Sequence, residues 1–181
     1  MLYVAALSLV LACGGVAYAA PGTSDESDVA RLRARGLAVP VDGVRASDLV
    51  DTYQQARDGG MRAHEALDIA APRGTPVLAV EDGRIAKLFS SRQGGLTIYQ
   101  FDPASEFAYY YAHVDRYAPG LTEGAGVRRG QVIGYVGSTG NAAMDAPHLH
   151  FGVYRLGPER AWWRGSPLNP YLLWAPLFNR R

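Results

Sequence analysis

The sequence contains very little cysteine and almost no net charge. Its one cysteine, Cys13, excludes an intrachain disulfide and any zinc site built from several cysteine thiolates. With 18 basic and 17 acidic residues the net charge is +1, which leaves no excess of positive charge to attract nucleic-acid phosphates. We therefore expect no nucleic-acid partner, and any metal ion would have to be held by histidine and carboxylate side chains.

Internal repeats are also absent, whereas turn-forming residues are abundant. Twenty-one glycines and eleven prolines are spread along 181 residues, of which 48% are hydrophobic. This composition favours one main globular domain of short strands joined by turns. We expect a mainly β fold, with an antiparallel β-sandwich or barrel-like core and a short helical segment near the N-terminus. The predicted strands are 75–80, 84–89, 96–101, 107–113, 131–136 and 148–154, with a hairpin turn at 81–83.

The first 20 residues carry no charged side chain and contain an apolar run. They indicate a signal peptide cleaved after Ala19, or a lipoprotein signal in which Cys13 would carry the lipid. An uncleaved anchor is a third interpretation, because a run of about 20 residues is barely long enough to span a bilayer. Each interpretation predicts export to the periplasm or cell envelope, and two of the three attach the protein to a membrane.

Three further segments follow this apolar start. Residues 21–45 are predicted to be a linker with a short helical segment. The linker is polar and extends to residue 28, and the helix spans 28–35 with a solvated basic face. Residues 46–175 are expected to form the main domain and 176–181 a tail. The aromatic and proline-rich segments Trp162-Trp163 and 167–174 are expected to pack across a sheet edge, with a substrate-facing tryptophan as the alternative.

The most informative stretch is Ala146-Pro147-His148-Leu149-His150-Phe151, in which two histidines lie two residues apart. On a strand, side chains two residues apart project from the same face, with Cβ atoms roughly 6–7 Å apart. That spacing allows one imidazole to bind a metal ion while the other lies beside a metal-bound water.

A second motif, His64-Glu65-Ala66-Leu67-Asp68, places an imidazole and a carboxylate four residues apart. On a helix the two side chains would share a face, and Glu65 would be a candidate general base. The breaks at Gly59-Gly60 and Pro72-Arg73-Gly74 leave room for only a short helix. We therefore predict that His64 ends a loop and that Asp68 opens a strand.

Together the two motifs contain the side chains of a catalytic zinc site. His64, Asp68 and one histidine of the His148–His150 pair supply three ligands, and three ligands with an open fourth position are typical of catalytic zinc. Such an ion lowers the pKa of its bound water to about 7 and polarises a carbonyl group. Hydrolysis also needs a base and an oxyanion donor, and His113 and the other histidine of the pair remain for these roles.

Four stretches of the chain resemble the lysostaphin/LytM-type zinc metallopeptidases, the M23 family of peptidoglycan endopeptidases. They follow the family's order and together cover roughly residues 45–175. The stretches are His64-Glu65-Ala66-Leu67-Asp68-Ile69-Ala70-Ala71-Pro72-Arg73-Gly74-Thr75-Pro76-Val77, Tyr111-Ala112-His113-Val114, Gly130-Gln131-Val132-Ile133-Gly134-Tyr135-Val136-Gly137-Ser138-Thr139-Gly140 and Pro147-His148-Leu149-His150-Phe151. Four motifs in one order make a chance match very improbable.

The resemblance implies a LytM-type antiparallel β core and one Zn²⁺ ion per chain, held by His64, Asp68 and His150. It implies that His148 is the general base and that His113 is the acid or the oxyanion donor. It further implies an exported endopeptidase that hydrolyses peptide bonds in the stems or cross-bridges of peptidoglycan. We expect the protein to be a monomer.

Four positions depart from the family pattern without removing a candidate ligand or catalytic histidine. Ala66 replaces a frequent glycine, Gly152 replaces a common glutamate, and Asp145-Ala146 replaces a frequent Thr-Gly pair. Asp145 either orients a neighbouring histidine or simply forms a turn.

Two other functions are compatible with the sequence. A non-catalytic LytM-type regulator would use the same fold to activate a cell-wall amidase, although such relatives typically lack some metal ligands. A plain wall-binding module would keep the zinc site without turnover.

Overall fold

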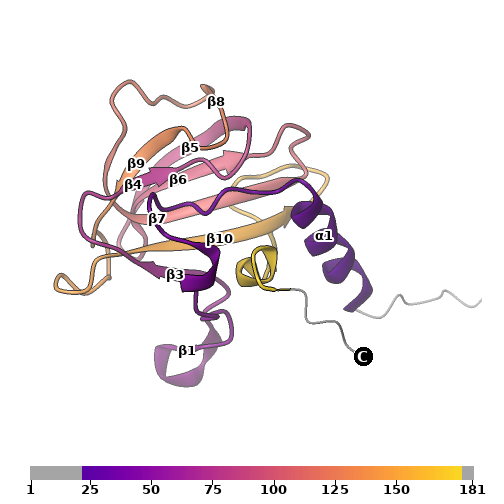
Figure 1. Ribbon diagram of the computed structural model, residues 1–181, viewed down its shortest axis with the longest axis horizontal. Helices are drawn as coiled ribbons and strands as arrows, with labels where there is room; N and C mark the ends of the chain where they lie inside the picture. The colour runs from indigo at the N-terminus through magenta and orange to yellow at the C-terminus, as the bar shows by residue number, and fades with distance from the viewer. Residues whose placement is uncertain (1–21, 177–181) are drawn as a thin grey trace, which may run out of the picture.

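The computed structural model describes residues 22–176 (Figure 1). The predicted signal, lipoprotein or anchor segment at 1–20 lies outside these residues, as does almost all of the predicted tail. Among the described residues, no helix is both long and apolar enough to cross a membrane. The helical elements are α1 (Gly22–Ala34), η1 (Ala46–Asp48), η2 (Asp58–Gly60) and η3 (Pro170–Leu173). The strands are β1 (Ala56–Arg57), β2 (Arg62–Ala63), β3 (Leu67–Ala70), β4 (Pro76–Leu78), β5 (Gly83–Ser91), β6 (Gly95–Phe101), β7 (Phe107–Tyr117), β8 (Gly126–Val127), β9 (Val132–Val136), β10 (His148–Leu156) and β11 (Gly165–Leu168).

Nine of the described strands form one antiparallel sheet (Figure 1). Its main path runs β11-β10-β7-β6-β5-β8, and β3 pairs with β10, β9 with β7, and β4 with β9. The short β1–β2 hairpin is separate and projects away from the sheet. The predicted mainly β, antiparallel fold is confirmed. Within residues 22–176 the path ends at β8 and β11, so the sheet stays open and forms no closed barrel.

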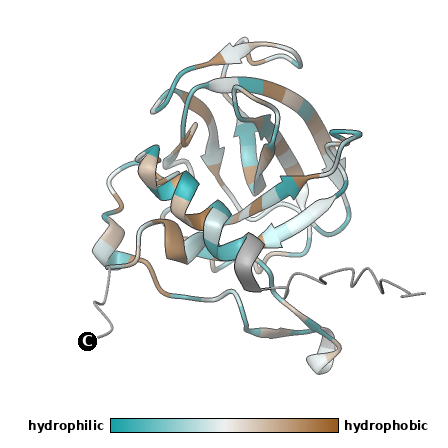
Figure 2. Ribbon diagram, turned by 90° about the vertical axis from the view of Figure 1, so that its right-hand side faces the viewer, coloured by the Kyte–Doolittle hydropathy of each residue, from teal (hydrophilic) through white to brown (hydrophobic). Residues whose placement is uncertain are grey.

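The long strands place alternate residues on two different faces of the sheet. In β10, Leu149, Phe151 and Val153 are fully buried, whereas His148 and His150 project from the opposite face. Figure 2 shows the alternation as hydrophobic and hydrophilic bands along the strands. The buried face belongs to a core that also contains Leu32 of α1. One face of the sheet therefore builds the core and leaves the other face available for a site.

The helix α1 begins at Gly22, so the predicted linker at 21–28 is wrong for nearly all of that segment. Small, polar and acidic residues are typical of linkers. An acidic residue such as Asp25 also stabilises the first turn of a helix, because it interacts favourably with the helix dipole. Val29 and Leu32 pack against the core, and this tertiary contact stabilises the helix more than local propensity does.

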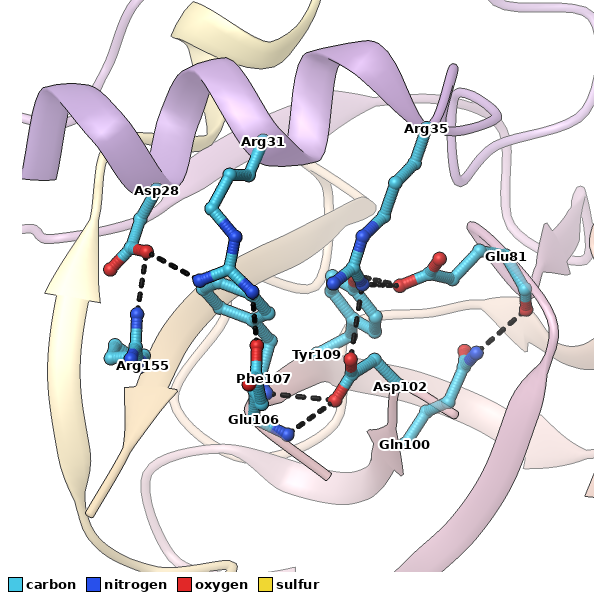
Figure 3. A network of polar contacts seen from close by, with 10 residues as sticks. All are labelled: Asp28, Arg31, Arg35, Glu81, Gln100, Asp102, Glu106, Phe107, Tyr109 and Arg155. Atoms are coloured by element: carbon cyan, nitrogen blue, oxygen red, sulfur yellow. Dashed lines mark hydrogen bonds and ion pairs between the residues drawn. The ribbon is translucent and has the colours of Figure 1, made fainter. Parts of the chain in front are cut away.

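The basic face of α1 is bound to its surroundings and is not simply solvated, so that prediction is also wrong (Figure 3). The three arginines have these partners: Arg31 pairs with Asp28 and Glu106, Arg33 with the carbonyl groups of Leu172 and Ala175, and Arg35 with Glu81 and Asp102. The Asp102 carboxylate is buried and also accepts hydrogen bonds from the backbone N–H groups of residues 106 and 107. These contacts fix α1 against the turn between β6 and β7.

The predicted hairpin between 75–80 and 84–89 does not form. Both strands exist, as β4 and β5, but β4 pairs with β9, and β5 pairs with β6 and β8. The Glu81 carbonyl between them accepts a hydrogen bond of 2.8 Å from the Gln100 side chain, and its carboxylate accepts one from Tyr109. These tertiary contacts turn the chain away from a local hairpin.

The aromatic segment near the C-terminus lies partly at the sheet edge, as predicted. There β11 pairs with β10, and Trp174 packs against Phe151 with ring centres 5.9 Å apart. Trp162, in the connection between β10 and β11, instead lies over the face that carries the histidines. Its ring centre is 4.8 Å from that of Tyr99 and 5.5 Å from that of Phe89.

Candidate active site

All four histidines line one groove on the open face of the sheet, together with Asp68. The groove has a volume of about 490 Å³, which is enough for several residues of an extended peptide. The structure therefore places all five candidate residues, which come from separate parts of the sequence, at one location.

Asp68 and His150 are neighbours because they lie directly opposite each other in the β3–β10 pair. Leu67 and Ile69 on either side of Asp68 are buried in the core, so strand alternation turns the carboxylate towards the groove. His64 lies in the short connection between β2 and β3. The glycine and proline residues on either side of this segment predicted that His64 lies in a loop and Asp68 in a strand, and the structure confirms both positions.

Thr52 fixes both His64 and Asp68, and no pattern in the sequence singled it out. The Nδ1–H of His64 donates to the Thr52 carbonyl at 3.0 Å. The Thr52 hydroxyl accepts from the backbone N–H of Asp68 at 2.9 Å and donates to the Ala66 carbonyl at 3.2 Å. A carbonyl can only accept, so Nδ1 of His64 carries the proton and Nε2 directs its lone pair into the groove.

Three atoms meet on the groove wall, and each of them can act as an acceptor for a proton or a metal ion. Nε2 of His64 lies 3.0 Å from Nδ1 of His150, and Oδ1 of Asp68 lies 3.1 Å from each of them. Ligand atoms bound 2.0–2.1 Å from tetrahedral zinc are roughly 3.3 Å apart, so the triangle has the size of one face of a zinc coordination shell. Acceptor atoms this close repel one another unless a proton or cation lies among them. The three residues therefore fit a metal ion.

The protonation states of this group also suit a metal ion. Burial raises the pKa of the Asp68 carboxyl, but its contacts with His150 and His64 outweigh burial and hold that pKa well below its usual range. Burial lowers the pKa of His150, and the nearby Asp68 opposes this only in part. At neutral pH the site therefore combines a carboxylate with a neutral imidazole, which are the forms that bind metals.

His113 reaches the groove through an irregularity in β7. In a regular strand it would share the buried face of Tyr109 and Tyr111. However, β7 changes its partner from β10, which pairs as far as Ala112, to β9, which pairs from Val114 onward. His113 lies at this change with φ of 59°, in the left-handed region that is uncommon for residues other than glycine. Ala112 and His113 consequently both line the groove.

His113 and His148 lie beside the three acceptor atoms, with ring centres 5.0 Å apart. Each donates its Nδ1–H to a backbone carbonyl, His113 to Thr139 at 2.8 Å and His148 to Ala146 at 2.9 Å. Each therefore presents Nε2 to the groove, and Nε2 of His148 is 3.8 Å from Oδ1 of Asp68. Burial lowers the pKa of His113 to about 4, so its ring is neutral at pH 7.

The partner of His148 is a backbone carbonyl and not the neighbouring Asp145. Asp145 is exposed and lies in a turn in which the Ala146 N–H donates to the Ala143 carbonyl at 3.1 Å. Of the two roles considered for Asp145, the structure supports the turn residue.

Arg57 contacts the triangle from the separate β1–β2 hairpin. Its guanidinium donates to Oδ2 of Asp68 at 2.6 Å, and this is the oxygen that faces away from the histidines. The bond fixes the plane of the carboxylate and leaves Oδ1 for the groove. No sequence motif marks Arg57, because only the tertiary position of the hairpin brings it to Asp68.

Three tyrosines line the groove, Tyr99, Tyr110 and Tyr154. The ring of Tyr110 packs edge-on against His150, with centres 5.8 Å apart. Burial raises the pKa of Tyr110 and Tyr154, to about 12 for Tyr154, so both remain protonated hydrogen-bond donors at neutral pH.

Known proteins share the sequence features of this groove. The profile of peptidase family M23 matches residues 62–170. The L-Ala--D-Glu endopeptidase of Bacillus subtilis is 38% identical over 117 residues, which are 61% of this chain and 36% of that protein. The DD-carboxypeptidase/endopeptidase Mpg of Neisseria meningitidis is 39% identical over 116 residues, which are 64% of this chain and 24% of that protein. The chain thus spans only about a third or a quarter of the length of these relatives.

Solved structures share the fold. The catalytic domain of lysostaphin from Staphylococcus simulans has a TM-score of 0.54 and 26% identity, and the match covers 80% of this chain and 96% of that one. LytU has a TM-score of 0.57 and 28% identity, over 71% and 85% of the two chains. The family profile covers more than half of the sequence and includes all five candidate residues of the groove. The chain belongs to peptidase family M23.

Proposed function

We propose that this chain is an exported, zinc-dependent endopeptidase that hydrolyses peptide bonds in the stems or cross-bridges of bacterial peptidoglycan. The observation that carries the proposal is the triangle of His64 Nε2, Asp68 Oδ1 and His150 Nδ1 in an open groove, beside two further histidines. The names of relatives support the substrate, since they include an L-Ala--D-Glu endopeptidase and the peptidoglycan DD-endopeptidase ShyC of Vibrio cholerae.

In this proposal His64, Asp68 and His150 hold one zinc ion. A zinc ion bound there supplies an acidic water and polarises the carbonyl group of the peptide bond. Thr52 and Arg57 orient the ligands, because they bind the His64 Nδ1–H and the second carboxylate oxygen of Asp68.

His148 is the proposed general base. Its Nδ1–H is bound to the Ala146 carbonyl, so the lone pair of Nε2 is available in the groove to accept a proton. The ring lies on the same strand face as His150, and this position supports a role beside the proposed metal ligands.

His113 is the proposed acid or oxyanion donor, and the structure adds a condition to that role. In the neutral ring the proton is on Nδ1, which donates to Thr139, so Nε2 is an acceptor. His113 becomes a donor towards the groove only after it takes a second proton. A developing negative charge on the substrate favours that protonated form.

The competing functions, a non-catalytic amidase regulator and a wall-binding module, do not require a complete catalytic set. Here the three candidate ligands and the two further histidines are all present, and the groove is open to solvent. Completeness of the set supports turnover over binding alone.

The test is mass spectrometry of the muropeptides that residues 21–181, loaded with zinc, release from purified peptidoglycan. Cleavage between two amino acids by the wild type, and none by His148→Ala, is the expected result. A folded, zinc-loaded protein that releases no peptides but stimulates a cell-wall amidase would contradict the proposal and support the regulator.

Export is tested separately by N-terminal sequencing after expression of the full chain in a Gram-negative host. We expect loss of the first 19 residues, or of the first 12 with lipid on Cys13. A full-length product in the cytoplasm would contradict both versions.

A further inference from the structure

The groove continues past the histidines into a second hollow that ends at two tryptophans. Tyr99 and Tyr154 line both hollows, whereas Trp162, Trp163 and Arg164 line only the second. The second hollow has a volume of about 270 Å³. The two hollows are therefore parts of one continuous surface.

A series of aromatic contacts connects the second hollow to the metal-binding triangle. Starting from His150, the ring centres follow at 5.8 Å to Tyr110, 4.7 Å to Tyr99, 4.8 Å to Trp162 and 5.4 Å to Trp163. The path is about 21 Å long, a distance that an extended peptide of about six residues covers. When a short peptide of the substrate lies in the groove, the group that carries this peptide can therefore reach Trp163.

The two tryptophans have different surroundings. Trp162 packs against the small apolar cluster of Phe101, Ala108 and Leu156, and this contact anchors the loop on the sheet. Trp163 is 69% exposed and adds little to the core. A large exposed aromatic ring at the end of a groove is typical of a binding contact.

We propose that Trp163 and the second hollow bind a sugar ring of the glycan strand to which the cleaved peptide is attached. This inference rests on the proposed function and extends it from the peptide to the saccharide. A pyranose ring has an apolar C–H face that stacks on an indole plane, and hydroxyl and N-acetyl groups at its edge that need polar partners. The guanidinium of Arg164 and the hydroxyl groups of Tyr99 and Tyr154 provide such partners beside the ring.

A sugar fits this hollow better than an apolar peptide side chain does. Its lining combines two indole rings with an arginine and two phenols. Burial raises the pKa of Tyr99 and Tyr154, so both phenols remain hydrogen-bond donors. Arg164 already pairs with Glu159 at 3.8 Å, and an apolar side chain would cover these polar groups without offering them a further hydrogen bond. A saccharide uses both kinds of surface at once.

The test compares two substrates that contain the same peptide. One is peptidoglycan with its glycan strands, and the other is the peptide fraction released from the sugars by an N-acetylmuramoyl-L-alanine amidase. We expect Trp163→Ala to reduce the preference for the glycan-bearing substrate about tenfold, through KM, the size of a lost aromatic stacking contact. Trp163→Phe should restore part of the preference. Leu172→Ala, which removes an exposed apolar side chain elsewhere, should leave it unchanged.

A second measurement keeps this inference separate from the proposed function. Binding of peptide-free glycan chains to the full protein, followed by calorimetry, needs no turnover. Binding by the wild type that Trp163→Ala abolishes supports the sugar site even if no peptide is cut. Equal losses on both substrates, or no glycan binding by the wild type, would overturn it.

Discussion

The strand β7 exposes three consecutive tyrosines to two different environments. Tyr109 and Tyr111 are fully buried on the core face, where the first donates to Glu81 and the second to Gln100 at 2.7 Å. Tyr110, between them, faces the groove and contacts the His150 ring. On the core face the hydroxyl groups form hydrogen bonds to other side chains of the protein. On the groove face the polar groups surround an open groove.

Charged groups show the same difference between the two faces. Under α1, the cation of Arg35 lies between the carboxylates of Glu81 and Asp102, so donors meet acceptors (Figure 3). In the groove, acceptor atoms of His64, Asp68 and His150 meet one another (3.0–3.1 Å). A matched network stabilises the fold, whereas a cluster of possible metal ligands this close together suits a bound cation.

The largest expected effects concern the two groove histidines of β10. His150→Ala removes a proposed ligand and should lower zinc affinity and activity together. His148→Ala leaves the ligand set intact, so zinc should remain bound while turnover falls by about 10²- to 10⁴-fold. Metal analysis after dialysis and a wall-lysis assay on both variants distinguish the roles.

The opposite pattern would reverse the roles of the two residues. If both variants keep zinc and activity, the groove is not the catalytic centre, and the polar groups on this face have no catalytic role.

The next effect concerns the matched face. Arg35→Met leaves the buried Asp102 carboxylate without its cation and should reduce the free energy of unfolding by about 3 kcal/mol. Zinc content and turnover of the remaining folded protein should not change. Arg45→Met breaks an exposed pair with Asp48 and serves as a control whose urea unfolding curve should stay near the wild type. Loss of zinc in Arg35→Met would show that the two faces are not independent.

Arg57 differs from both groups of contacts, because it is a donor that contacts the carboxylate of the proposed metal site. Arg57→Leu should weaken zinc binding by about 10- to 100-fold, because the Asp68 carboxylate loses the contact that orients it. Arg57→Lys should recover part of the affinity. Competition with a fluorescent chelator measures the change, and an unchanged affinity in Arg57→Leu would remove Arg57 from the site.

The smallest effect is a pH dependence of stability due to His113. Burial lowers the pKa of His113 from 6.5 to about 4, so as pH falls the unfolded chain takes up this proton before the folded chain does. The stability due to the neutral ring is therefore lost between pH 6.5 and 4. Metal-free wild type should lose about 1–2 kcal/mol more than His113→Gln between pH 7 and 5. Equal losses in urea unfolding would contradict the assignment.

Sequence patterns predicted the groove best where local geometry decides. Alternation along a strand was sufficient to place His148 and His150 on one face, and glycine and proline breaks were sufficient to put His64 in a loop. His113 was expected in the groove because hydrolysis needs a base and an oxyanion donor, and the family resemblance supplied its particular role, but strand alternation did not predict its position. Regular alternation would turn the His113 side chain towards the core. The change of strand partner and the left-handed backbone conformation of His113 turn it towards the groove.

Long-range contacts explain what the sequence did not reveal. Thr52 and Arg57 support the triangle from segments that have no motif of their own. The basic face of α1 has the pattern of a solvated face, and only the position of Asp102 and Glu106 shows that it is bound. The turn at 81–83 has hairpin chemistry, but the Glu81 contacts direct β5 to other partners.

The pairing of β3 with β10 has a consequence for how the protein acquires its activity. Residues 67–70 meet residues 148–151, so the triangle forms only when the chain closes a loop of about 80 residues. Before that step, of the three proposed ligands only His64 and Asp68 are close together in the sequence. We expect the high-affinity site to be a late product of folding. An ion that binds there would then cross-link two distant segments, as a disulfide does in chains that have the cysteines this one lacks.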